Sequence, residues 1–271
     1  MITSTSNERV KYVHALSRRK TRQEEGRFVV EGLRLVEEAI RANVQPDFIF
    51  YTTEVDERGQ KLVERLHAGG VVCLDVTPGV MRFCSETETP PGILAVLPFA
   101  SSQLPARPTL SVITDALRDP GNLGTLLRTS AAAGVDEVLL GPGTVDLYNL
   151  KVVRGAMGTH FRLPIATMTW PVIATHLNGP SIWLADVRDA IPYTQVDWTK
   201  PSALIVGGEA EGASAEAEKL ATGRVSIPMQ CGIESLNAAV AAAIILFEAQ
   251  RQRMSEVTSP TTASSRASVS V

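Results

Sequence analysis

Short apolar runs alternate with amphipathic stretches along most of the chain. Residues 28–30 are apolar, and Leu33, Val36 and Ile40 then repeat at helical spacing until Asn43 ends the pattern. This pattern predicts a strand followed by a helix. Further strands are predicted at 48–51, 71–74 and 93–97, with a helix around 62–66. We therefore expect a small α/β domain over residues 1–97.

The alternation resumes at 110–114, after a stretch with three prolines, 98–109, that predicts an extended linker. Apolar runs predict later strands at 138–140, 182–185, 203–206 and 225–227. Helices are predicted at 123–133, 150–157, 171–177, 215–220 and 238–250. Such alternation predicts a mainly parallel sheet covered on both faces, in a second α/β domain over 110–254. The Ser/Thr-rich residues 255–271 predict a disordered tail.

The composition is that of an ordinary globular protein, with 44% hydrophobic and 20% charged residues among 271. No apolar run reaches membrane length, and the first residues lack the apolar core of a signal peptide. The three cysteines, Cys73, Cys84 and Cys231, are far apart and odd in number. They predict reduced thiols in a cytoplasmic protein, with no disulfide and no metal site.

The net charge of −3 conceals a basic stretch near the N-terminus. Residues 9–22 contain no acidic side chain and six basic ones, Arg9, Lys11, Arg18, Arg19, Lys20 and Arg22. Such a run suits a phosphate backbone, so we predict an RNA-binding surface here. A solvated helix face is the alternative.

Three loops next to predicted strands carry the candidate chemistry. The first, 119–128, opens a helix whose amides would favour an anion. Asn122 is predicted at the helix cap, and Arg128, nearly two turns further on, is predicted to share its face. Arg128 stands in an otherwise apolar segment, so it either extends to solvent or is held for a function.

The second loop, 207–212, follows a buried strand and is rich in glycine, which allows close approach of a ligand. Its spacing fits neither the GxGxxG dinucleotide motif nor a P-loop, and a plain turn is the alternative. The third loop runs from Pro228 through Gly232 to Ser235 and Asn237, which begin an alanine-rich helix. Helix capping alone is the other explanation for these last two side chains.

Together the loops resemble the three motifs of the SpoU/TrmH family of RNA ribose 2′-O-methyltransferases. The motifs here are Asn122…Arg128, Gly207-x-Glu209-x-x-Gly212, and Ile227-Pro228-Met229…Ser235-Leu236-Asn237. Residues 7–32 and the turn at 91–93 resemble the small RNA-binding domain, similar to a ribosomal protein, that precedes many catalytic domains of the family. The resemblance covers residues 6–254. Segments 232–234 and 238–239 depart from the usual third motif without removing a functional side chain.

This resemblance implies a C-terminal SPOUT domain with a deep trefoil knot, which pattern alone would not predict because true knots are rare. It also implies a homodimer with residues of both subunits in each active site, and S-adenosylmethionine as the methyl donor. The implied cofactor-binding residues are Gly207, Gly208, Ile227, Met229 and Leu236. The implied catalytic residues are Asn122, Arg128, Glu209, Ser235 and Asn237.

The implied reaction is methylation of a ribose 2′-OH in structured RNA. A guanidinium is a poor base, so we expect Arg128 to clamp a phosphate and stabilise developing alkoxide charge, with Asn122 orienting it. Glu209 is expected to bond Asn122 or the ribose. A substrate domain ahead of the knot favours 23S rRNA. A tRNA methyltransferase, a non-catalytic RNA-binding relative and a Rossmann-type nucleotide enzyme are the alternatives.

Overall fold

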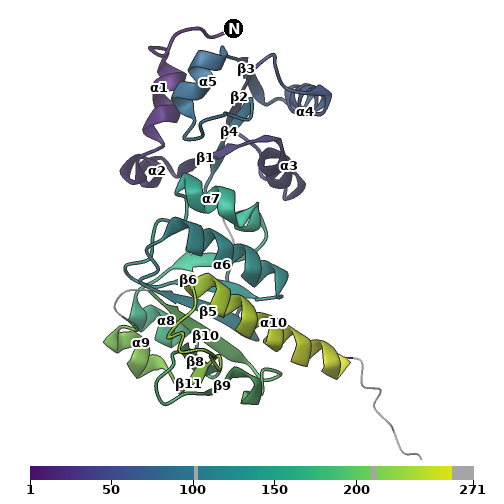
Figure 1. Cartoon of the computed structure of the whole chain (residues 1–271). Coiled ribbons are helices and arrows are strands. Elements are labelled where there is room, and N and C mark those ends of the chain that lie inside the picture. The colour runs from purple at the N-terminus through teal and green to yellow at the C-terminus, as the bar shows by residue number, and fades with distance from the viewer. Residues whose placement is uncertain (101–102, 209–211, 258–271) are drawn as a thin grey trace, which may run out of the picture.

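The computed structural model describes residues 1–100, 103–208 and 212–257, and these form two β-sheets (Figure 1). The first sheet has the order β1-β4-β2-β3, with β1 (Arg27–Glu31), β2 (Phe48–Tyr51), β3 (Val72–Asp75) and β4 (Ile93–Pro98). The second has the order β7-β6-β5-β10-β8-β11-β9. Its strands are β5 (Leu110–Asp115), β6 (Glu137–Leu140), β7 (Ile165–Thr167), β8 (Ser181–Ala185), β9 (Ile191–Pro192), β10 (Ser202–Gly207) and β11 (Gly223–Ser226).

Helices cover both faces of the first sheet, because its strands direct alternate side chains to opposite faces. Val29 and Phe50 belong to one buried cluster, shared with α1 and α5, while Phe28 and Ile49 belong to another, shared with α3 and α4. The helices of this part are α1 (Glu8–Ala15), α2 (Arg19–Glu25), α3 (Leu33–Arg41), α4 (Glu57–Ala68) and α5 (Pro78–Cys84). Burial on both faces explains why these strands are continuously apolar in the sequence.

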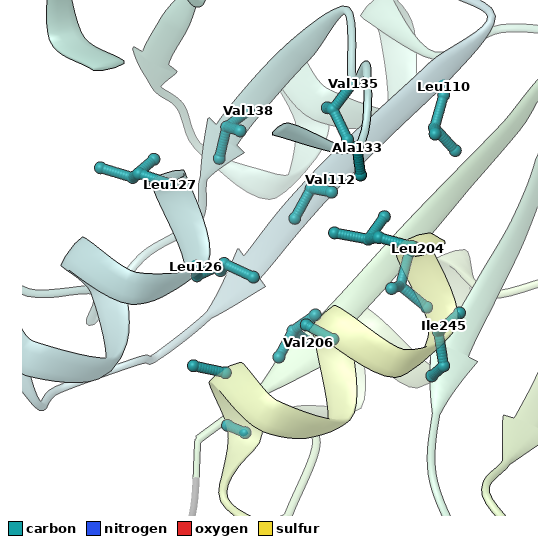
Figure 2. Packing of buried hydrophobic residues seen from close by; sticks show 14 of the residues in the cluster. Leu110, Val112, Leu126, Leu127, Ala133, Val135, Val138, Leu204, Val206 and Ile245 are labelled. Carbon is teal, nitrogen blue, oxygen red and sulfur yellow. The ribbon is translucent and has the colours of Figure 1, made fainter. Parts of the chain in front are cut away.

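The second sheet is parallel throughout its described strand pairs, which confirms the predicted α/β class. On one face, Val112 of β5 and Val206 of β10 pack with Leu126 of α6 and Ile245 of α10 (Figure 2). The cluster on the other face includes residues of α8 and α9. The helices are α6 (Pro120–Ala132), α7 (Leu150–Ala156), α8 (Trp170–His176), α9 (Ala215–Leu220) and α10 (Ala238–Val257), with short 3-10 turns η1 (Thr159–Phe161) and η2 (Tyr193–Gln195).

The strand order brings distant segments together at one edge of this sheet. β10 lies between β5 and β8, and β11 lies between β8 and β9. Asp115 is the register partner of Gly207, so the carboxyl ends of β5 and β10 lie side by side. In parallel α/β sheets, ligands bind outside the carboxyl ends of the strands. The three predicted loops all begin at or reach this edge.

Helix α7 joins the two parts of the molecule (Figure 1). Leu150 and Val153 belong to the two buried clusters of the first sheet, although they lie in the second region of the sequence. Phe99 stacks on Tyr148 with ring centroids 3.9 Å apart, and the ring centroid of Phe28 lies 4.7 Å from that of Tyr148. The segment after β4 is therefore held against both parts from its first residue.

Arg22 also connects the two parts, which corrects its expected place on an RNA-binding surface. Only 3% of the residue is exposed. Its guanidinium donates to the carbonyls of Leu16 at 2.8 Å and Ser17 at 2.7 Å, and its Nε donates to Asp146 at 3.1 Å. Because these donors are used inside the protein, Arg22 is not presented to a phosphate.

Several elements differ from the sequence prediction, including strands β7 and β9, which were not predicted. Helix α5 was not predicted, although Thr77 caps it through the amide of Val80 and Pro78 begins it, both ordinary helix-start signals. Helix α10 continues past the predicted end at Gln250 to Val257, into the predicted tail. The rest of that tail, residues 258–271, lies outside the described residues.

Candidate active site

A cavity of about 550 Å³ lies at the carboxyl edge of the parallel sheet. Its walls come from the ends of β8, β10 and β11, from the segment 227–237 and from the first turns of α10. Apolar side chains form part of the wall, and Asp186, Ser226 and Ser235 add polar groups. A largely preformed hollow with a few polar groups is typical of small-molecule sites.

All five residues predicted to bind a cofactor line this cavity. They are Gly207, Gly208, Ile227, Met229 and Leu236. Ser235 and Asn237, predicted from the same motif, line it as well. The structure thus brings the second and third loops together around one space. Their roles there stay predictions.

Gly208 has a structural reason to be glycine, apart from any ligand. A Cβ at this position would lie 2.7 Å from the carbonyl oxygen of Ala116, closer than real Cβ contacts. At Gly207 the nearest atom would be 3.7 Å away, an ordinary contact. The close approach between the loops after β5 and β10 therefore requires glycine at 208. The space around residue 207 would accommodate a Cβ.

The start of α6 differs from the prediction, because Asp119 and not Asn122 is the cap. The Asp119 carboxylate accepts the amide hydrogen of Asn122 at 2.7 Å, and Pro120 begins the helix. The Asn122 side chain instead accepts a hydrogen bond from Nδ2 of Asn237 at 2.8 Å. Asn237 Oδ1 also accepts from the amides of Ala239 and Val240, so it caps α10. Capping and bridging are thus combined in one side chain.

Arg128 does not share a face with Asn122, which corrects that expectation. Six residues at about 100° each turn the helix by about 240° beyond one full turn. Arg128 is exposed and lines a different hollow, together with Met157 and Arg162. It makes no ion pair with any residue that the structure describes. Within one chain, the first motif is therefore split between two surfaces.

The remaining predicted residues are placed as follows. Glu209 lies outside the described residues. Arg9, Lys11, Arg18, Arg19 and Lys20 are exposed on and around α1 and α2. The Arg9 guanidinium lies 5.6 Å from the ring centre of Phe48, and Lys20 pairs with Glu24 at 3.8 Å. Apart from Arg22, the basic run is therefore open to solvent.

Asp186 is a cavity residue that sequence reasoning missed. It follows β8 directly and pairs with Arg188 at 2.9 Å and Arg224 at 3.5 Å. Burial acts to raise its pKa, but hydrogen bonds from Arg188 and Val187 and the positive charge of Arg188 together outweigh burial and lower the pKa below the ordinary value. The signal was its position after a buried strand of a parallel sheet, the same position that Gly208 occupies after β10.

Comparison with known proteins identifies the family. Residues 109–247 match the model of the SpoU rRNA Methylase family. Residues 7–95 match the MRM3-like substrate binding domain. The chain belongs to the SpoU rRNA methylase family. The resemblance drawn from the three motifs is confirmed.

Curated relatives of this SpoU methylase act on ribosomal RNA by name. One is the 23S rRNA (guanosine(2553)-2′-O)-methyltransferase RlmP of Bacillus subtilis, 34% identical, with 91% of this chain and 97% of the relative covered. Another is the mitochondrial rRNA methyltransferase 3 of Homo sapiens, 33% identical, with 86% and 70% covered.

Solved SpoU structures share the whole fold. The AdoMet-bound rRNA methyltransferase from Sinorhizobium meliloti has a TM-score of 0.83 and 30% identity, with 92% of this chain and 97% of that chain covered. The SpoU methyltransferase AviRb from Streptomyces viridochromogenes, in complex with AdoMet, has a TM-score of 0.83, 29% identity and coverage of 92% and 99%. Both parts of the chain are therefore arranged as in known family members.

None of the helices among the described residues has the length and apolar character needed to cross a bilayer. The same part of the chain contains no group of three or more His, Cys, Asp or Glu side chains placed to hold a metal ion.

Proposed function

We propose that this chain transfers a methyl group from S-adenosylmethionine to a ribose 2′-OH of ribosomal RNA, with 23S rRNA as the substrate. The observation that carries the proposal is the cavity at the sheet edge. It gathers Gly207, Ile227 and Leu236, from two motifs that lie about 20 to 30 residues apart, around one space. The 23S rRNA and AdoMet named for family members support the choice of substrate and methyl donor.

The cavity residues suit S-adenosylmethionine, which supplies an activated methyl group on sulfur when bound. A volume of about 550 Å³ lies within the usual range for such ligands. Val206, Ile227 and Ile245 provide an apolar wall for a planar base. Ser226 and Ser235 offer hydroxyl groups to the polar end of the molecule.

Arg128 would act by charge and position. Its guanidinium would clamp an RNA phosphate and stabilise negative charge that develops on the 2′-oxygen. Asn122 and Asn237, joined by their 2.8 Å hydrogen bond, would fix the start of α6 against the loop over the cavity. Glu209 and Ser235 complete the proposed catalytic set.

The active form is proposed to be a homodimer in which each site is completed by the partner. Arg128 lines a hollow separate from the cavity of its own chain, so a second copy is needed to bring the two together. Val240, Phe247 and Met254 recur every seven residues on α10 and are 47%, 47% and 63% exposed. The second half of α10 projects beyond the sheet (Figure 1), and such an exposed apolar stripe suits another protein surface.

Several finer points belong to the same proposal. The insertion of β10 and β11 between earlier strands supports a trefoil knot in the C-terminal part.

The proposed division is an RNA-binding domain over 1–97, a linker over 98–109 and a methyltransferase domain over 110–254. Free cysteines at 73, 84 and 231 support the cytoplasm as the site of action. RNA would meet the N-terminal part at Arg9, Lys11, Arg18, Arg19 and Lys20.

The test measures binding and transfer separately. Calorimetry with S-adenosylmethionine should show one site per chain. Labelled methyl groups should pass to 23S rRNA from cells that lack the gene, and the product should resist alkaline cleavage at one nucleotide. Labelling of tRNA alone would overturn the substrate, and cofactor binding without transfer to any RNA would indicate a non-catalytic RNA-binding protein.

A further inference from the structure

A second hollow, of about 740 Å³, lies between the two parts of the chain and shares no lining residue with the cofactor cavity. One wall comes from α3 and α4, and the other from α6, the end of α7 and η1. We call it the arginine groove, after Arg34, Arg41, Arg58, Arg128 and Arg162. Glu37 and Glu38 also line it, so five positive charges face two negative ones and three remain uncompensated.

The two glutamates hold three of the arginines in place. Glu37 and Glu38 are 16% and 18% exposed, while the arginines that pair with them are 54–60% exposed. Arg58 Nε donates to Glu37 at 2.8 Å, Arg41 Nη1 donates to Glu38 at 2.6 Å, and Arg162 pairs with Glu38. A guanidinium has five N–H donors, so each arginine keeps donors that face the solvent.

Arg34 and Arg128 are the groove arginines without such an anchor. Both are exposed, and neither makes an ion pair with a residue in the described part of the chain. Arg34 lies on α3 and Arg128 on α6, so each wall carries a positive charge that forms no ion pair with a described carboxylate. A ligand that compensates both must be anionic and must extend across the groove.

The contact between the walls is fixed by a glycine. Gly158 has a φ of +87°, and a Cβ there would lie 2.9 Å from Cβ of Glu38. Only glycine allows α3 to approach this turn so closely. The Arg162–Glu38 pair spans the same contact. The relative position of the two sets of arginines is therefore set by packing.

The chemistry of the lining indicates the class of ligand. None of the lining residues is aromatic, so the groove offers no platform on which a base could stack. Guanidinium forks match phosphate oxygens in geometry and charge. We propose that the arginine groove binds the phosphate backbone of the substrate RNA between the N-terminal part and Arg128. This inference rests on the proposed function, because it takes RNA as the substrate.

The test compares two double variants that each remove two exposed positive charges. Arg34→Gln/Arg162→Gln alters the groove, and Lys200→Gln/Lys219→Gln is the control. The two double variants are matched in their ion pairs. Arg162 and Lys200 each have a carboxylate partner, whereas Arg34 and Lys219 form no ion pair in the described part of the chain. Arg128 is left intact, since it belongs to the proposed catalytic set. The probe is 23S rRNA from cells that lack the gene, in filter binding from about 50 to about 400 mM KCl.

The groove variant should bind this RNA about tenfold more weakly at low salt, with a slope of log Kd against log salt reduced by about one to two. The control should bind like the parent, and S-adenosylmethionine affinity should be unchanged in both. Arg34→Lys/Arg162→Lys should keep the slope because it keeps the charge. Equal RNA binding by groove variant and control overturns the proposal.

Two further outcomes separate this inference from the function. If light scattering shows that the groove variant loses its partner subunit while RNA affinity holds, the groove is a subunit contact and the inference is overturned. If the parent binds RNA through the groove but transfers no methyl group, the inference stands and the proposed enzymatic function fails.

Discussion

Asn237 donates a hydrogen bond to Asn122 across 115 residues of sequence, at 2.8 Å, and so joins the start of α10 to the first turns of α6. Asn237 also caps α10, whereas the cap of α6 is Asp119. Asn237 therefore both caps a helix and bridges two helices, whereas Asn122 takes part in the bridge but caps no helix. Both residues belong to family motifs.

This relationship predicts unequal effects of two alanine variants. Asn237→Ala should lower the free energy of unfolding by about 2 kcal/mol, since it loses a cap and a bridge, and Asn122→Ala by about 1 kcal/mol. Urea unfolding at one protein concentration would measure both. The double variant should be less unstable than the sum of the two, by about 1 kcal/mol. Strict additivity would show that the bridge contributes nothing.

Arg128→Ala should abolish detectable methyl transfer, a loss of at least about 100-fold, and leave folding and S-adenosylmethionine binding intact. The side chain is exposed and its described surroundings offer it no ion pair, so its removal leaves no buried charge. Arg65→Ala, an exposed position on α4, is the matched control. Parent-like turnover by Arg128→Ala would remove it from the catalytic set.

Phe247→Glu should convert a dimer into a monomer of 29.1 kDa in light scattering. Phe247 is 47% exposed in the single chain and lies in the middle of the apolar stripe on α10. A carboxylate at this position would be buried without a partner charge when two subunits meet there. Val172→Glu, at a 50% exposed position on α8, is the control and should leave the mass unchanged. A dimer that persists in Phe247→Glu would place the subunit contact elsewhere.

Arg22→Ala should destabilise the protein by about 3 to 5 kcal/mol, because it leaves the mostly buried Asp146 without its partner. The double variant Arg22→Ala/Asp146→Ala should recover part of that loss. Lys20→Ala, whose side chain is 86% exposed, should have little effect in the same denaturant titration. A small effect of Arg22→Ala on stability would contradict its structural role.

His160 should make stability fall in mild acid. Burial lowers its pKa from 6.5 to about 4, so between these values the unfolded chain binds a proton that the folded chain does not. The free energy of unfolding is therefore unaffected by this group above about pH 6.5. It falls by roughly 3 kcal/mol as the pH drops to about 4. His160→Gln should flatten this part of the pH dependence in urea unfolding.

Exposed His67→Gln is the control for that titration and should leave the slope as in the parent. Nε2 of His160 donates a hydrogen bond to the carbonyl oxygen of Leu147 at 2.8 Å, and the amide group of Gln can donate in its place. An unchanged acid slope in His160→Gln would assign the loss of stability to other groups.

The sequence alone predicted most of the helices and strands, and its resemblance to a family indicated the residues expected to bind a cofactor. Alternation of short apolar runs with amphipathic segments predicted the parallel sheet, because buried strands and half-buried helices leave different periods. Gly207, Ile227 and Leu236 were predicted because their motifs resemble those of the SpoU/TrmH family, and the structure places all three around one cavity. These features depend on neighbours in the chain, which a linear pattern records.

Tertiary structure decided what each basic side chain faces. Arg22 and Lys20 are two residues apart, yet one is buried against Asp146 and the other is in solvent. The helical period alone separates Arg128 from Asn122, since six residues do not return to the same face, but only the tertiary structure brings Asn122 against Asn237. The partners of Arg22 and Asn122 lie more than a hundred residues away, and no local period encodes which distant segment will cover a given side chain.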